Sequence, residues 1–241
     1  MCIICRGENI DGVTSLVLSG CRTLKKISYL PNGLTYLDCS STFIETIVDL
    51  PDSVVEFKCN HCPELEYIPK LSNSLRVFSC RRCFSVKELP TLPSQLSHLD
   101  CSFTRIKNID SFPNTLSRLE IDCCYFLTSI ALLPDSLTYL CCSRCYQLKS
   151  LPNIPPNLQY LYCVLCVCFV DIPKYTQNMQ VFFNINCPWL KDNPLFEKNM
   201  KKLETLQRFI KSSMFRRRLE KRIWMKQGGM YEDIMKEVMK Y

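Results

Sequence analysis

Apolar residues recur along the first 190 positions of the chain with a period of 20 or 21 residues. Each period starts at an apolar residue, here called the anchor, and a second apolar residue follows three positions later in every period. The anchors are Val13, Leu34, Val54, Leu75, Leu96, Leu116, Leu137, Leu158 and Met179. A fixed period of this length predicts a repeat architecture in which each turn of chain stacks on the next.

Within a period, positions are counted from the anchor. The anchor, plus three and plus five are apolar or small in nearly all periods, as at Leu75, Phe78 and Cys80. This alternation predicts a short strand whose equivalents in successive turns pair in parallel. Prolines such as Pro31 and Pro93 occur in the return segments and disfavour helix there. We therefore expect an extended side opposite the sheet, and almost no helix before residue 195.

The plus-eight position is linked to the length of the period. Cysteine occupies it in seven periods, whereas the two 20-residue periods have Thr42 and Thr104 there. Inside a turn, this residue is expected to face backbone amides that lack partners in the sheet, and buried donors need an acceptor. Asparagine would serve well, a thiol only weakly, and a hydroxyl lies between them.

These periods resemble the leucine-rich-repeat family, whose unit reads L-x-x-L-x-L-x-x-N/C-x-L. The resemblance covers residues 13–190. The 21-residue periods resemble its cysteine-containing type, as in Cys62-Pro63-Glu64-Leu65, and segments such as Leu89-Pro90-Thr91-Leu92-Pro93 resemble the short repeats of bacterial effector proteins. The mixture looks most like leucine-rich-repeat proteins of large DNA viruses. It implies a solenoid, or horseshoe, with a parallel sheet on its concave face.

The chain contains 18 cysteines, and four periods contain C-x-x-C, a spacing that elsewhere indicates zinc or redox chemistry. Both cysteines of each pair lie in inward columns that Leu, Ile or Thr fill in other periods, and thirteen of the 18 lie in these columns. A buried core role is therefore favoured over a metal site or structural disulfides. The remaining cysteines are the ones expected to be exposed: Cys2, Cys5, Cys123, Cys141 and Cys168.

Charge divides the chain into parts. The net charge is +7, and residues 1–190 hold 16 basic and 16 acidic residues, which leaves 14 basic and 7 acidic residues for 191–241. We expect an N-terminal edge at 1–12, a solenoid of about nine repeats at 13–190 and a basic helical cap or tail at 191–241. The first residues lack the pattern of a signal peptide, and no apolar run is long enough to span a membrane. An intracellular, cytoplasmic and monomeric protein is expected, in the host cytoplasm if the protein is viral.

Side chains at plus one, plus two and plus four should point outward from the inner sheet, where such solenoids bind partners. A charged middle zone and an aromatic C-terminal zone emerge from these columns. The predicted contact residues are Tyr36, Arg76, His98, Asp100, Arg118, Glu120, Tyr139, Tyr160, Tyr162 and Phe183. Aromatic residues are enriched at interface hot spots, although strand tyrosines also pack against lateral neighbours without binding anything.

Catalysis is the less favoured hypothesis for His98. It stands near Asp100 and Arg118, but no Ser or Cys nucleophile is evidently paired with it, and outward strand side chains form no pocket. The chain has no glycine-rich phosphate loop. The sequence predicts no enzyme activity and no cofactor.

From Glu197 onward the apolar spacing becomes helical, and Gly228-Gly229 interrupts it. A cap over the last turn is the first hypothesis for this tail. The segment also resembles the IQ motif, I-Q-x-x-x-R-G-x-x-x-R, at Leu206, Gln207, Lys211 and Arg216, with Ser212 in place of the glycine. That resemblance implies a calmodulin-like partner. Nucleic acid or an anionic membrane remains an alternative for the basic Arg216-Arg217-Arg218 cluster.

The favoured function is a non-catalytic module that binds a protein partner on the concave face. A substrate-recruiting subunit of a ubiquitin ligase is the alternative, because leucine-rich repeats often serve that role. Residues 1–12 are too few for an F-box, and the tail is too short for the catalytic domain of the bacterial effectors.

Overall fold

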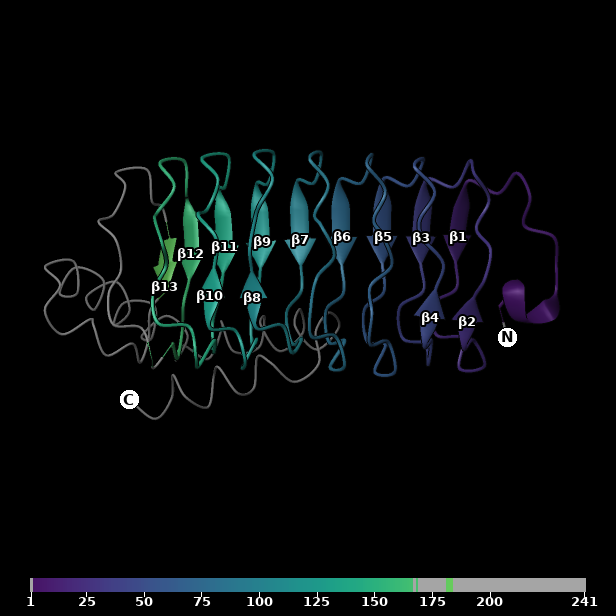
Figure 1. Cartoon of the computed structure of the whole chain (residues 1–241), viewed down its shortest axis with the longest axis horizontal. Coiled ribbons are helices and arrows are strands. Elements are labelled where there is room, and N and C mark those ends of the chain that lie inside the picture. Colours follow the sequence, from purple (N-terminus) through teal and green to yellow (C-terminus); the bar gives the residue numbers. More distant parts are fainter. Residues whose placement is uncertain (1, 167, 169–180, 184–241) are drawn as a thin grey trace, which may run out of the picture. The chain divides into compact units, whose positions relative to one another are not determined.

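A nine-stranded parallel sheet forms the main element of the fold (Figure 1). The computed structural model describes residues 2–166, 168 and 181–183. Neighbouring strands of the sheet come from successive turns, so they lie side by side in the order of the sequence. The strands are β1 (Ser15–Val17), β3 (Tyr36–Asp38), β5 (Glu56–Lys58), β6 (Val77–Ser79), β7 (His98–Asp100), β9 (Arg118–Glu120), β11 (Tyr139–Cys141), β12 (Tyr160–Tyr162) and β13 (Val181–Phe183).

The register of this sheet follows the sequence period. Tyr36 pairs with Glu56, 20 residues later, and Glu56 pairs with Val77, 21 residues later. Equivalent positions therefore lie beside each other in every pair of turns, whichever period length separates them. The predicted leucine-rich-repeat solenoid is confirmed. The helical C-terminal segment that was predicted beyond it lies outside the described residues.

The core is built from the inward columns that the sequence predicted. In the fourth turn Leu75, Phe78 and Cys80 all have no exposed surface. Each of these columns continues through the neighbouring turns, and the Phe57 and Phe78 rings stack with 5.5 Å between their centroids. Fully burying one such side chain stabilises the fold by about 2–3 kcal/mol. Both cysteines of the four C-x-x-C pairs are fully buried, so their assignment to the core is confirmed.

The plus-eight side chains link each turn to the one before it. Cys83 Sγ donates to the carbonyl of Cys59 at 2.8 Å, and Cys145 Sγ donates to the carbonyl of Ile121 at 3.0 Å. The sulfur also interacts with the backbone N–H of the preceding plus-eight residue, as Cys145 does with Cys124. The thiol of Cys145 thus donates to the carbonyl of Ile121 and interacts with the backbone N–H of Cys124. Contact with a backbone amide is what the sequence predicted for plus eight. Burial raises the pKa of Cys145 well above its ordinary value, so its thiol keeps the proton that it donates.

The two threonines make a different bond. Thr42 Oγ1 donates to the carbonyl of Cys39 in its own turn at 2.8 Å, and Thr104 Oγ1 donates to that of Cys101 at 2.7 Å. A hydroxyl lies closer to its backbone than a thiol does, so it reaches the near carbonyl. The short turns therefore have a plus-eight hydrogen bond within the turn, whereas the thiols bond to the preceding turn.

Every described turn reverses direction at plus seven, in the left-handed region of backbone space. Gly20 has φ of 75° there. The other turns place a non-glycine residue at this position: Ser41, His61, Arg82, Phe103, Cys123, Arg144 and Leu165, with φ between 55° and 60°. The N–H of the plus-seven residue donates to the next turn, for example from Ser41 to the carbonyl of Asn60 at 2.7 Å. These bonds hold a conformation that costs an ordinary residue about 1–2 kcal/mol.

A second ladder of polar side chains runs along plus six. Asn60 Oδ1 accepts the N–H of Arg81 at 2.8 Å, and Asp122 Oδ1 accepts the N–H of Ser143 at 3.0 Å. Each such side chain satisfies a backbone donor of the following turn. Asp122 is only 4% exposed, and burial raises its pKa from 3.8 to about 6.

The return side is extended, as predicted. Two short parallel pairs lie there, β2 (Lys26–Ile27) with β4 (Thr46–Ile47) and β8 (Asn108–Ile109) with β10 (Ser129–Ile130). Among the described residues, the single helical element is a 3₁₀ turn, η1 (Ile4–Arg6). Prolines begin turns that lead back into the sheet. In these turns the N–H of the anchor donates to the carbonyl of the proline three residues earlier, as from Leu96 to Pro93 at 3.1 Å.

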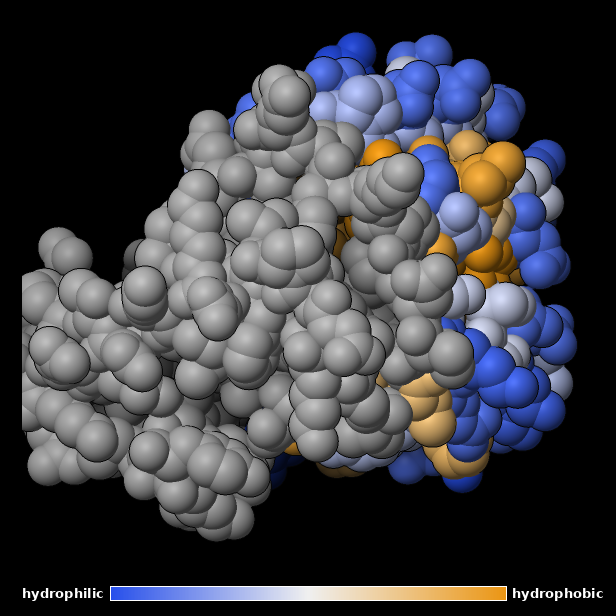
Figure 2. Space-filling model, turned by 90° about the vertical axis from the view of Figure 1, so that its left-hand side faces the viewer, coloured by the Kyte–Doolittle hydropathy of each residue, from blue (hydrophilic) through white to orange (hydrophobic). Residues whose placement is uncertain are grey.

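Some hydrophobic side chains are exposed at the surface of the solenoid. Figure 2, seen from the β13 side of Figure 1, shows hydrophobic side chains between hydrophilic ones on the described part of that face. In the described part of the chain, no helix is long and apolar enough to cross a membrane.

The cysteines outside the two inward columns differ among themselves. Cys168 is exposed, and Cys2, Cys5 and Cys141 are partly exposed. The expectation of an exposed Cys123 is wrong, because this residue is 2% exposed. Other plus-seven residues such as Ser41 and His61 are exposed, and Cys123 differs from them in forming a side-chain hydrogen bond with Tyr125.

Candidate interaction surface on the parallel sheet

The outward residues of the nine-stranded sheet form a continuous surface, here called the sheet face. Nine of the ten predicted contact residues lie in its strands, and Arg76 directly precedes β6. The register places His98, Arg118, Tyr139 and Tyr160 in one row, and Asp100, Glu120, Cys141 and Tyr162 in the next. For Phe183 the structure describes the strand and not the side chain.

Arg118 stands where the charged and aromatic zones meet. Its Nε donates to Glu120 Oε1 at 2.7 Å, and its guanidinium carbon lies 3.8 Å from the centre of the Tyr139 ring. His98 Nε2 lies 3.5 Å from the same Glu120 oxygen. The two zones that the sequence separated are therefore one connected network. A cation over an aromatic face adds about 0.5–2 kcal/mol to such a contact.

Three tyrosines continue this network toward the C-terminal turns. The ring of Tyr139 lies 6.2 Å from that of Tyr160 and 5.6 Å from that of Tyr162, measured between centroids, with the planes tilted by about 40° in both pairs. All three side chains are partly exposed. Burial raises the pKa of Tyr139 and of Tyr162, so both hydroxyls stay protonated and able to donate. Arg118 and these three residues are called the tyrosine cluster below.

The acidic residues of the middle zone differ in their availability. Burial opposes ionisation of Glu120, but hydrogen bonds from His98 and Arg118 outweigh it and lower its pKa. Asp100 is only 8% exposed and its Oδ1 accepts the N–H of Ser102 at 3.0 Å. Burial, with the charge of Glu120, raises the pKa of Asp100. Asp100 thus holds its own turn, and Glu120 is ionised and paired with Arg118 across the surface.

The other predicted contact residues stand apart from the tyrosine cluster. Tyr36 lies beneath Lys58, whose Nζ is 5.4 Å from the ring centre and 2.6 Å from Glu56 Oε1. Arg76 is exposed beside β6. The IQ-like residues Leu206, Gln207, Lys211 and Arg216 lie outside the described residues.

Sequence reasoning missed a row of exposed aromatic residues at plus nine, on the loop that follows the left-handed turn. The row comprises Phe43, Phe84, Tyr125 and Tyr146, which are 39–52% exposed. Tyr125 and Tyr146 stack with 5.3 Å between ring centroids. The signal was present in the sequence, since the plus-nine column is aromatic in four periods. The row lies outside the strand columns, from which partner contacts were predicted.

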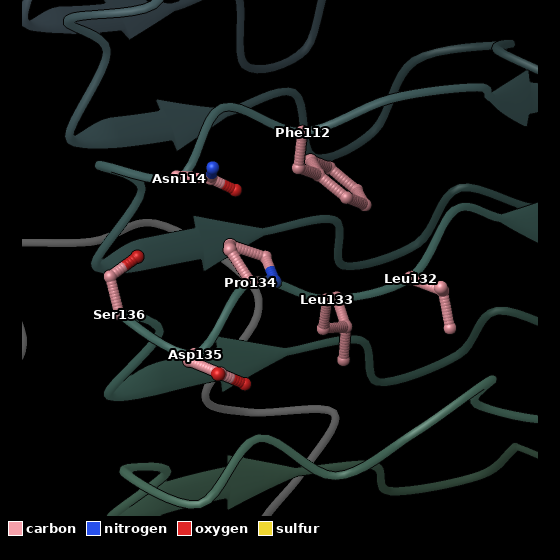
Figure 3. A pocket seen from close by; sticks show the side chains of 7 residues that line it. All are labelled: Phe112, Asn114, Leu132, Leu133, Pro134, Asp135 and Ser136. Carbon is pink, nitrogen blue, oxygen red and sulfur yellow. The ribbon is translucent and has the colours of Figure 1, made fainter.

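A hollow of about 360 Å³ lies between the two return segments that lead into β9 and β11 (Figure 3). The residues that line it are Phe112, Asn114, Leu132, Leu133, Pro134, Asp135 and Ser136. Asp135 is its one ionisable side chain. Phe112 and the two leucines lie toward one end and the polar groups toward the other (Figure 3).

No protein-family model and no curated protein matches the sequence. Two similar solved structures are YopM proteins. YopM from Yersinia enterocolitica is 22% identical, with 72% of this chain and 50% of that chain covered and a TM-score of 0.47. YopM from Yersinia pestis, described as a leucine-rich effector protein, is 18% identical, with 72% and 65% covered and a TM-score of 0.44. The chain spans half to about two thirds of the length of these proteins.

The fold itself rests on the internal register of the sheet and on its 20- or 21-residue turns. On that ground the chain folds as a leucine-rich-repeat solenoid.

Proposed function

We propose that the sheet face binds a protein partner, with the tyrosine cluster as the centre of the interface, and that the protein has no catalytic activity of its own. The supporting observation is that Arg118 stacks on Tyr139, which in turn contacts Tyr160 and Tyr162, on an outward and partly exposed surface. Tyrosine and arginine are enriched among residues that dominate binding energy. Their rings and guanidinium are already held by neighbours, so little side-chain freedom is lost on binding.

The chemistry of the surface defines the partner. The three rings supply apolar area together with hydroxyl donors, and the carboxylate of Glu120 beside them is already paired with Arg118. A partner segment that carries apolar side chains and hydrogen-bond acceptors for the tyrosine hydroxyls would be complementary to it.

Binding experiments test this proposal with a combined Tyr139→Ala, Tyr160→Ala and Tyr162→Ala variant. The matched control combines Tyr125→Ala and Tyr146→Ala, which removes tyrosines of neighbouring turns from the plus-nine row. Each truncated hot-spot residue costs about 1 kcal/mol or more, so the triple variant should bind at least about 100-fold more weakly. Circular dichroism first establishes that both variants fold. A partner that the triple variant retains and the control loses would refute the assignment to the sheet face.

We also propose an intracellular location. The buried thiols act as hydrogen-bond donors to carbonyl oxygens, a role that requires them to be reduced. Thiols stay reduced in the cytosol, whereas oxidising compartments favour disulfides. Two further proposals rest on the sequence. One is that the repeats are related to those of large DNA viruses, and the other is that residues 191–241 form a basic cap or tail.

Recruitment of a substrate to a ubiquitin ligase, and binding of a calmodulin-like protein or nucleic acid through the tail, are the alternatives. Charge reversal in Arg216-Arg217-Arg218 distinguishes binding through the tail from sheet-face binding. Nucleic-acid binding would be lost in this variant and would weaken steeply with salt, whereas a partner of the tyrosine cluster would be retained.

A further inference from the structure

Three cysteine sulfurs meet at the N-terminal edge of the solenoid. The Sγ atoms of Cys2, Cys5 and Cys21 all lie within 4.8 Å of one another, and those of Cys5 and Cys21 are 3.7 Å apart. Cys21 is buried, and the other two are partly exposed. This group is separate from the sheet face.

The local backbone holds two of these cysteines in place. Cys2 and Cys5 are the ends of a C-x-x-C segment that precedes the first repeat. The N–H of Arg6 donates to the carbonyl of Cys2 at 3.1 Å, and the N–H of Gly7 donates to the carbonyl of Ile4 at 3.0 Å. Gly7, with φ of 70°, ends the turn. Neither cysteine occupies a column of the solenoid core, so packing of the repeat does not account for them.

Cys21 differs from the other plus-eight cysteines in its partners. The later ones donate to a carbonyl of the preceding turn, as Cys83 does to Cys59. Cys21 belongs to the first turn, and its partners are the backbone N–H of Cys2 at 3.3 Å, the Cys5 thiol and the Thr23 hydroxyl, also at 3.3 Å. An N–H that points at a sulfur stabilises the thiolate, which is the form that binds metals.

We propose that Cys2, Cys5 and Cys21 bind one zinc ion. Tetrahedral zinc with bonds of about 2.3 Å to sulfur requires sulfur atoms about 3.8 Å apart, and the distance between Cys5 and Cys21 fits. A disulfide requires about 2.05 Å, so these sulfurs stand at a metal-ligand spacing. Three thiolates leave one position of the tetrahedron for water or another ligand, and the partial exposure of Cys2 and Cys5 gives solvent access to the group.

The topology agrees with this assignment. The ion would join the segment 2–7 to the first turn of the solenoid. The terminal turns of a solenoid need a cover for their open core edge, and a metal bridge would fix that cover in place.

Titration of the full chain with Zn²⁺ tests the site after chelation and under reducing conditions. We expect one zinc per chain by elemental analysis and, on replacement by Co²⁺, a sulfur-to-cobalt charge-transfer band. Replacing a ligand, as in Cys5→Ser, should weaken zinc binding by more than about 100-fold, since even outer-shell changes cost 10–100-fold. Cys168→Ser, which alters an exposed cysteine elsewhere, is the matched control and should bind as the unaltered chain does.

Thermal melting gives a second readout, because a ligand of the native state raises the melting temperature. Zinc should raise it for the unaltered chain and for Cys168→Ser but not for Cys5→Ser. Cys2→Ser serves the same purpose if Cys5→Ser does not fold. Failure of the unaltered chain to retain zinc, equal affinity in the ligand variants, or a Cys5–Cys21 disulfide found by mass spectrometry in place of the metal would each overturn the proposal.

Discussion

Replacing Asp122 by asparagine should make the solenoid more stable at neutral pH and remove one component of its pH dependence. Asp122 Oδ1 accepts the N–H of Ser143 at 3.0 Å, and an asparagine oxygen can accept the same bond. The carboxylate is 4% exposed, and burial raises its pKa from 3.8 to about 6. The charges of Glu120 and Asp100 raise it further, while a hydrogen bond with Cys141 lowers it.

Asp122 binds its proton more tightly in the folded chain than in the unfolded chain. The folded chain holds the proton of Asp122 up to about pH 6, whereas an unfolded aspartate loses it near pH 3.9. The stability that this residue contributes is therefore fully present below about pH 4 and is lost as the pH rises through about 6. The difference of about two pKa units corresponds to about 3 kcal/mol of unfolding free energy, because one unit is 1.36 kcal/mol.

Urea unfolding followed by circular dichroism between about pH 4 and pH 8 measures this difference. The stability of Asp122→Asn relative to the unaltered chain should rise by up to about 3 kcal/mol across that range. Asp135→Asn makes the same charge change at an exposed position and is the control. A stability difference that does not vary with pH, or a variant that is less stable at about pH 8, would refute the reasoning.

Three further changes test the packing of the turns by urea unfolding. Ser41→Gly should stabilise the chain by up to about 1 kcal/mol, since it relieves a left-handed φ of 57°, whereas Ser41→Val should destabilise it. Stabilisation by the valine would contradict this account of plus seven. Cys83→Ala leaves the Cys59 carbonyl without its thiol donor and should cost about 1–3 kcal/mol, and Cys83→Ser should recover part of that loss. Phe78→Ala should cost about 3–5 kcal/mol through the cavity it leaves beside Phe57, and a cost below about 1 kcal/mol would show that the neighbouring turns collapse into it.

The sequence predicted the inward columns because burial leaves a strong record in residue type. The anchor and plus-three positions, occupied by Leu75 and Phe78 in the fourth period, are apolar in every period. Because strand side chains alternate in direction, these inward positions identify the outward columns as well. The row that joins Arg118 to Tyr139 and Tyr160 was therefore accessible to reasoning from periodicity.

The left-handed turn at plus seven could not be predicted from residue type. Glycine occurs there only at Gly20, and residues as different as His61 and Phe103 take its place in later turns. Hydrogen bonds to the following turn compensate for a cost of about 1–2 kcal/mol, so the position tolerates most side chains. The burial of Asp100 was equally hidden, because its column also contains exposed and apolar residues.

The register of the sheet is the same across 20- and 21-residue turns, so each repeat consists of a part with constant length and a part with variable length. The stretch from anchor to plus eight keeps its length in all periods, and the single missing residue of the short turns falls after plus eight. Length variation is thus absorbed in the return segment and never reaches the strands. An array built in this way can gain or lose whole units by duplication or deletion in its gene, and the surface it presents then lengthens or shortens by one strand without disturbing the neighbouring ones.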